Sequence, residues 1–231
     1  MSAVIRMSKL AFKHLTLPLM ILVAVLLHSQ RGVDAQQSGL DAYRQKGYTV
    51  NSRIPIYSQV IEFSYPRGFK SAHEHESRDN YIHEWIPEGE TLSDWSRMIT
   101  LTGIRGLSSD PNMTPEQLLS QIASGFKRAC PSTFAAKILS RLPISGHNAL
   151  SAVVGCGSVN SGTARSAIAI LIAIQGSSDY YTIQLAERSA PLNRAPKLEG
   201  PSWNTKINQL KPIKLCKITA NESWPYPSCM D

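Results

Sequence analysis

The stretch from Tyr81 to Gly103, YIHEWIPEGETLSDWSRMITLTG, is the part of the sequence from which the fold is predicted. Its first part alternates side chains at period two, which predicts a strand over 81–86. Pro87-Glu88-Gly89 ends that strand, because proline lacks the ladder donor and glycine turns freely. Thr91-Leu-Ser-Asp94 has capping-box spacing and predicts one short helical turn. The β-branched run 99–102 predicts a second strand, so we expect a sheet with covering helices around this pair.

The first 35 residues have the pattern of a secretory signal peptide. Arg6, Lys9 and Lys13 form a basic region ahead of the apolar run Leu15–Leu27. That run is shorter than the ~20 residues that a membrane span needs. Val-Asp-Ala at 33–35 fits the small-x-small cleavage rule, so we expect a mature chain from residue 36, periplasmic or secreted and without a stable membrane span. An uncleaved N-terminal anchor is the alternative.

The charge of the mature chain is small. The whole chain carries a formal charge of +7, and the leader holds four basic residues and one acidic residue, so about +4 remains. A charge of this size, scattered along the chain and without a basic arm, argues against nucleic acid as a partner.

All four cysteines lie after the leader. An even number in an exported chain favours two disulfides, and three pairings are possible. We favour Cys130–Cys156 together with Cys216–Cys229, because the second bond closes a short loop in a proline-rich tail. No Cys-x-x-Cys spacing occurs, so metal binding by these cysteines is disfavoured.

The sequence divides into an arm, one domain and a tail. Residues 36–53 are polar and lack a periodic run, which predicts a mobile arm or peripheral helix. Residues 54–212 are expected to form a single α+β domain, and 213–231 a disulfide-clipped tail. The expected strands cover 58–65, 69–76, 81–86, 99–102, 135–142, 149–156, 166–175 and 180–187.

Two helices are predicted to cover this sheet. Thr114-Pro115-Glu116 is a strong helix start, and apolar residues recur at helical spacing up to Cys130. The second helix covers 202–210. Because most strand connections are short, the sheet should be antiparallel, and one of its faces can bury both helical stripes.

The block Phe63-x-Tyr65-Pro66-x-Gly68-Phe69, followed by a mid-chain helix and a meander, resembles the Mog1/PsbP-like superfamily, which includes exported bacterial members of the DcrB type. The block 84–91, EWIPEGET, is similar to uncharacterised secreted bacterial proteins of the same plan. The resemblance covers about 54–190. It implies a non-catalytic layered fold used for binding, and it supplies no catalytic residues.

One hairpin collects possible metal ligands. His73 and His75 share a face of a strand and could present two imidazoles to zinc or copper. Pairing across 77–80 places His83 opposite Glu74, on the other face, and Glu84 opposite His73. A third histidine ligand is therefore badly placed, and we favour a solvated hairpin with cross-strand His–Glu pairs over a metal site.

Other candidate chemistry is weaker. Gly155-Cys-Gly157-Ser158 lacks the Gly-x-Ser-x-Gly pattern of a serine nucleophile and the pattern of a phosphate-binding loop. Trp85 and Trp95 are candidates to line a ligand groove, with a place in the core as the alternative. No cofactor is expected.

Together these features predict an exported, non-catalytic binding or accessory protein of the bacterial cell envelope, whose partner is another envelope or secreted protein. The alternative is a metal-assisted hydrolase that uses the His73/His75 hairpin.

Overall fold

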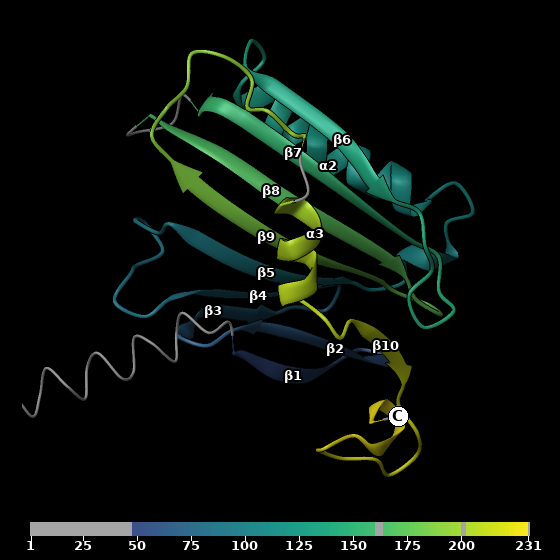
Figure 1. Cartoon of the computed structure of the whole chain (residues 1–231). Coiled ribbons are helices and arrows are strands. Elements are labelled where there is room, and N and C mark those ends of the chain that lie inside the picture. The colour runs from purple at the N-terminus through teal and green to yellow at the C-terminus, as the bar shows by residue number, and fades with distance from the viewer. Residues whose placement is uncertain (1–47, 160–163, 200–201, 231) are drawn as a thin grey trace, which may run out of the picture. The chain divides into compact units, whose positions relative to one another are not determined.

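The computed structural model of the chain describes residues 48–159, 164–199 and 202–230, and this part is built on two antiparallel sheets (Figure 1). The larger sheet has, in spatial order, β3 (Phe69–Glu76), β4 (Asn80–Pro87), β5 (Arg97–Ile104), β9 (Tyr180–Ser189), β8 (Arg165–Gln175), β7 (Ala149–Val159) and β6 (Phe134–Ser140). Each neighbouring pair is antiparallel, as short connections require. The fold is therefore α+β, as the sequence predicts.

The smaller sheet places β2 (Gln59–Pro66) between β1 (Thr49–Ile56) and β10 (Lys214–Lys217). Both outer strands of this sheet include residues outside the predicted domain, 54–212. β1 begins inside the segment expected to be an arm, and β10 lies inside the segment expected to be a tail. Both form backbone ladders with β2, a long-range interaction that the polar composition of these segments does not reveal.

The expected half-buried strand, β2, is buried on both faces from Gln59 to Ser64. Its polar residues are satisfied by partners on neighbouring segments. Glu62 accepts hydrogen bonds from Asn51 at 2.7 Å and Arg53 at 3.1 Å, so a charge that looks solvated in the sequence lies in the interior.

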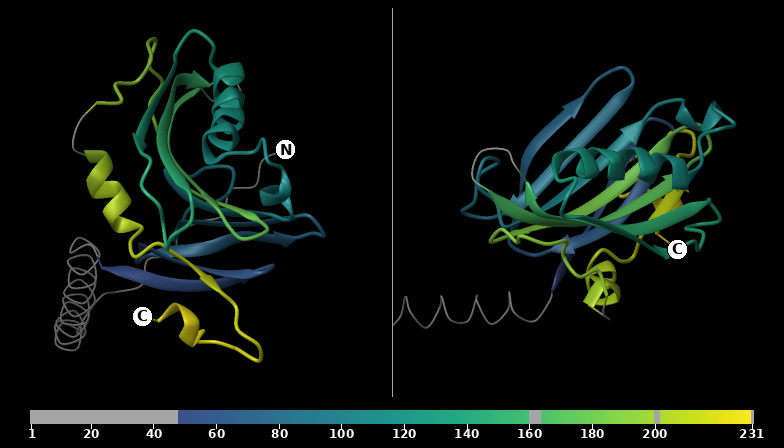
Figure 2. Two further views of the ribbon diagram at one scale, coloured as in Figure 1. Left: turned by 90° about the vertical axis from the view of Figure 1, so that its right-hand side faces the viewer. Right: turned by 90° about the horizontal axis from the view of Figure 1, so that it is seen from above.

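Two helices cover opposite faces of the larger sheet (Figure 2, left). α2 (Pro115–Ala129) starts with a full capping box between Thr114 and Gln117, and ends at Cys130 as predicted. α3 (Ser202–Gln209) lies on the other face. The expectation that one face buries both helices was wrong, because Trp203 of α3 joins the core between the two sheets, whereas Leu118 and Leu119 of α2 join a second core.

Strand β8 separates the two cores, as its continuous apolar run predicts. Its isoleucines Ile170, Ile172 and Ile174 face the smaller sheet, while Ala169, Leu171 and Ala173 face α2. On β8, the α2 side therefore carries two alanines where the other side carries isoleucines.

The predicted helical turn at Thr91–Asp94 is a tight turn instead. The backbone N–H of each of these two residues donates to the carbonyl of the other, at 3.2 and 3.1 Å. The threonine hydroxyl accepts from the Asp94 N–H, as in a cap, but no helical turn follows it.

Two short 3-10 helices complete the described elements, η1 (Leu107–Ser109) and η2 (Pro227–Cys229). The predicted signal peptide, 1–35, and the first part of the predicted arm, 36–47, lie outside the described residues. Within the described ranges, no helix has both the length and the apolar character to cross a membrane.

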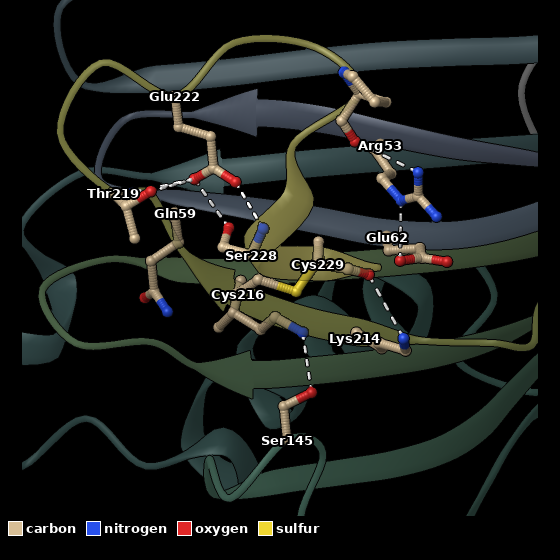
Figure 3. The surroundings of a disulfide bond; sticks show 12 residues. Arg53, Gln59, Glu62, Ser145, Lys214, Cys216, Thr219, Glu222, Ser228 and Cys229 are labelled. Carbon is tan, nitrogen blue, oxygen red and sulfur yellow. Dashed lines mark hydrogen bonds and ion pairs between the residues drawn. A yellow bond between two sulfur atoms is a disulfide. The ribbon is translucent and has the colours of Figure 1, made fainter. Parts of the chain in front are cut away.

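Both disulfides have the pairing favoured from the sequence. Cys130–Cys156 joins the end of α2 to β7, and Cys216–Cys229 joins β10 to η2. In the second loop the carboxylate of Glu222 accepts hydrogen bonds from the backbone and hydroxyl groups of Thr219 and Ser228 (Figure 3). The two backbone N–H donors are the main cause that lowers the pKa of Glu222 to about 2.

Glycines in β7 serve close packing of the chain. A Cβ at Gly157 would overlap the carbonyl oxygen of Arg194, and one at Gly155 would lie 2.5 Å from Pro196 Cγ. The Leu192 N–H donates to the Gly157 carbonyl at 2.7 Å. The Gly-Cys-Gly sequence therefore lets the segment before α3 cross β7 in direct backbone contact.

Candidate functional site

A cavity of about 640 Å³ opens on the α2 side of the larger sheet. Its walls come from the β4–β5 loop, the C-terminal half of α2 and the ends of β7, β8 and β9. We call it the Trp95 pocket. The lining residues used below are Asp94, Trp95, Phe126, Val159, Arg165, Ala167, Gln184, Ala186 and Arg188.

The pocket is hollow because its floor is made of small side chains. Ala167 of β8 and Ala186 of β9 line the floor, and each lies in register with a residue of the other strand, Arg188 and Ala169 respectively. Phe126 of α2 forms one wall, and the Cys130–Cys156 bond holds that end of the helix on β7. Small residues under the helix end leave a space that larger aliphatic side chains would fill.

Trp95 and Arg188 form the most specific contact in the pocket. The guanidinium of Arg188 lies 3.7 Å from the centroid of the Trp95 ring. Trp95 is buried, with 9% of its surface exposed, so the ring is a fixed platform. Burial is the main cause that lowers the pKa of Arg188, and the charge of Arg165 adds to it.

The guanidinium of Arg188 keeps its N–H edges open. Among the residues that the structure describes, none forms a hydrogen bond or ion pair with it. The stacked ring occupies one face of the planar group, and the five N–H donors lie around the edge. Gln184, on the same face of β9, likewise has a side-chain amide without a hydrogen-bond partner in the described ranges.

A second arginine lines the same pocket. Arg165 lies two residues before Ala167 on β8, hence on the same face of the sheet. It donates to Asp94 Oδ1 at 2.7 Å, and the Asp94 side chain is 73% exposed. The named lining residues therefore include two arginines against one carboxylate.

The two candidate tryptophans have different positions. Trp95 lines the pocket. Trp85 is 4% exposed and lies on the opposite face of the sheet, stacked on His83 with ring centroids 3.6 Å apart and on Tyr65 at 5.6 Å. Trp85 is thus a core residue and does not line the pocket.

The histidine hairpin has the predicted register. Glu74 pairs with His83, and Glu84 pairs with His73. His73 and His75 are exposed on one face. Across the described ranges, no three His, Cys, Asp or Glu side chains come together as a possible metal site.

A β-bulge in β3 adds a feature that the sequence did not indicate. The register shifts between Ser71 and His73, which turns Ser71 toward His83. Ser71 Oγ lies 2.8 Å from His83 Nε2, and the Tyr81 hydroxyl donates to Glu74 at 2.7 Å and lies 3.2 Å from His83 Nδ1.

The order serine, histidine, glutamate is that of a catalytic triad, but Glu74 Oε1 lies 3.6 Å from His83 Nδ1, too far for a hydrogen bond, and accepts from the Tyr81 hydroxyl instead. We therefore assign this network to holding β3 on β4. Burial of His83 lowers its pKa, against an opposing effect of Glu74.

Sequence reasoning missed the two arginines. Each stands at the end of an apolar strand, where a charge usually indicates a solvated strand end. The signal available was that Arg165 lies two positions before Ala167 and Arg188 two positions after Ala186, so each arginine shares a strand face with a small residue that leaves space.

No protein-family model matches the chain, and no curated protein matches it. Solved structures do. The Ran-binding protein Mog1p of Saccharomyces cerevisiae matches with 12% identity and a TM-score of 0.39, over 70% of this chain and 85% of that chain. LpqN of Mycobacterium tuberculosis, described as involved in cell envelope biogenesis, matches with 12% identity and a TM-score of 0.38, over 75% of this chain and 94% of that chain. At this identity the likeness concerns the fold alone.

Proposed function

We propose that the chain is an exported, non-catalytic binding protein of the bacterial cell envelope, and that the Trp95 pocket holds its ligand or part of its partner. One observation carries the proposal. A preformed cavity of about 640 Å³ combines apolar walls with a guanidinium that no described residue pairs. Binding sites for small molecules have this size and combine apolar walls with polar groups that orient the ligand.

The export part of the proposal is supported by the two disulfides, which persist in oxidising compartments. It predicts that N-terminal sequencing of protein from the cell envelope or medium starts at Gln36. Envelope-bound protein that still carries Met1 would instead support the uncleaved anchor.

The binding part is favoured over catalysis by the groups that line the pocket. Arginine stays protonated near neutral pH and cannot act as a general base, so Arg165 and Arg188 are suited to holding an anion rather than moving a proton. The hydrolase alternative has its own test. Elemental analysis of untagged protein and of the His73→Ala/His75→Ala variant would favour it if near-stoichiometric zinc or copper disappeared in the variant.

Pocket binding is tested by NMR. The chain has four tryptophans, hence four indole N–H signals in ¹⁵N-labelled protein, and Trp95→Phe assigns the one in the pocket. Titration with a library of small aromatic and aliphatic fragments should move the Trp95 signal. The signal of Trp224, which is 76% exposed in the tail, is the internal reference and should stay in place.

A filled pocket provides the matched control. Ala167→Leu should occupy the floor and abolish the shifts, whereas Ala190→Leu, at an exposed position outside the pocket, should leave them unchanged. Shifts that persist in Ala167→Leu, or that move Trp224 equally, would place binding elsewhere and contradict the proposal.

A further inference from the structure

We propose that the ligand of the Trp95 pocket is an organic acid, with an aromatic or aliphatic body against Phe126 and a carboxylate on the N–H edge of Arg188. This inference rests on the proposed function and names the chemistry of its ligand. The same carboxylate chemistry could come from a free organic acid or from the C-terminal residue of a peptide.

Arg188 is oriented to receive an anion. Its guanidinium is stacked 3.7 Å above the Trp95 ring and half-buried, so its orientation is set before a ligand arrives. A partly buried guanidinium without an ion-pair partner has lost part of its hydration and gained no ion pair in return. A carboxylate meets the geometry of its edge with two parallel N–H···O bonds, while the ring still covers one face.

Arg165 is paired only weakly and can exchange its partner for a ligand. Its ion pair with Asp94 joins side chains that are 40% and 73% exposed. Ion pairs this exposed contribute ~0–1 kcal/mol, so an incoming carboxylate can replace Asp94 at little cost. Asp94 is then a competitor of the ligand, and the two arginines leave one positive charge in excess over it.

The size and the walls of the pocket favour an organic acid over an inorganic anion. A cavity of about 640 Å³ is much larger than an inorganic anion requires. Trp95, Phe126 and Val159 supply apolar surface, and the Gln184 amide supplies a donor and an acceptor that no described residue uses. This arrangement fits an acid that carries an apolar body better than it fits free phosphate or sulfate.

The experiment uses three probes and the indole signal of Trp95 in the intact mature protein. The probes are N-acetylphenylalanine, its neutral carboxamide and 3-phenylpropionate. We expect the two acids to bind at least about tenfold more tightly than the carboxamide, because only they form charge-assisted bonds. Tighter binding of N-acetylphenylalanine than of 3-phenylpropionate identifies a peptide C-terminus as the source, and the reverse order identifies a free acid.

Variants assign the effect to named residues. Arg188→Gln should abolish the preference for acids. Arg188→Lys keeps the charge but should lose most of the preference for acids, since lysine cannot bind a carboxylate bidentately. Asp94→Asn should tighten acid binding several-fold by freeing Arg165. The matched control is Arg97→Gln, an arginine that stacks on Phe69 at 5.2 Å and does not line the pocket.

Each outcome bears on one of the two claims. Equal binding of acid and carboxamide at the Trp95 signal overturns the organic-acid inference and leaves the pocket as a binding site. An acid preference that survives in Arg188→Gln, with the variant folded by circular dichroism, overturns the role of Arg188. A Trp95 signal that no acid moves at millimolar concentration also overturns this inference, while the fragment titration decides the proposed function separately.

Discussion

The guanidinium of Arg188 at the end of β9 stacks on the ring of Trp95 in the β4–β5 loop, with 3.7 Å between guanidinium carbon and ring centroid. The Arg188 N–H also donates to the Ser96 carbonyl at 2.8 Å. A side-chain contact and a backbone bond thus tie the same loop to the same strand, which holds one wall of the pocket in place.

This contact should contribute measurably to stability. A double-mutant cycle with Trp95→Leu and Arg188→Met should give a coupling energy of about 1 kcal/mol in urea denaturation, between the values for exposed and desolvated cation–π pairs. The control cycle is Phe69→Leu with Arg97→Met. Because Arg97 is exposed and lies 5.2 Å from the ring centroid, this cycle should give about 0.5 kcal/mol or less. Equal coupling energies in the two cycles would contradict the assignment of Arg188 to a specific stack.

The segment 190–199 crosses β7 in close contact because residue 157 is a glycine. Gly157→Ala should lower the free energy of unfolding by about 2–3 kcal/mol, because its Cβ would collide with the carbonyl oxygens of Arg194 and, at 2.8 Å, Leu192. Backbone there can move only by breaking the bond from Leu192 to Gly157.

The matched substitution is Gly125→Ala on α2, where a Cβ would meet only the end of the Arg128 side chain at 3.9 Å. It should raise stability by up to about 1 kcal/mol through helix propensity. Chemical denaturation of both variants tests the pair, and a neutral Gly157→Ala would show that the 190–199 segment is not packed on β7 in solution.

The two disulfides should differ in what they stabilise. They close loops with sequence separations of 26 and 13 residues, so chain entropy favours the first by a small margin, about 3.5 against about 3 kcal/mol. We expect Cys130→Ala/Cys156→Ala to lower the unfolding midpoint more than Cys216→Ala/Cys229→Ala does, and to weaken pocket binding as well, since only the first bond holds α2 over the pocket. Unchanged ligand affinity after loss of Cys130–Cys156 would remove that link.

Stability should fall in mildly acidic solution because of His83. Burial lowers its pKa in the folded protein below the ordinary value of about 6.5, so the unfolded chain binds a proton more readily. The stabilising contribution is therefore full above about pH 6.5, and is lost as the pH falls through the lowered folded-state pKa.

Urea denaturation between pH 7.5 and 5 measures this effect. His83→Gln should flatten the curve relative to the wild type, whereas His75→Gln, on the exposed face of the same hairpin, should reproduce the wild-type slope. A wild-type slope in His83→Gln would assign the acid sensitivity to other groups.

Local rules predicted most elements because the same residues decide both pattern and structure. Three features depend on only a few neighbouring positions: the capping residues before α2, the apolar run of β8 and the 77–80 turn. The helix start, the buried strand and the hairpin register could therefore be predicted from the sequence. The β3 bulge at Ser71 could not be predicted, because a bulge is defined by how one strand pairs with its partner strand.

The candidate site was readable only in part. Trp85 and Trp95 look alike in the sequence, and both end up buried. What separates them is the face of the sheet. Trp85 meets Phe63 of the smaller sheet, and Trp95 meets an arginine 93 positions later in the chain.

The sequence by itself determined the α+β class, the antiparallel pairing, the limits of α2 and the favoured disulfide pairs, since each follows from spacing and side-chain chemistry along a short stretch. The tertiary structure alone decided that β1 and β10 join β2, that the helices lie on opposite faces, and that Arg165 and Arg188 meet beside Trp95. These features arise where distant segments bury surface together. Strand order and face assignment depend on the total packing of both cores, and no single stretch of the chain contains that information.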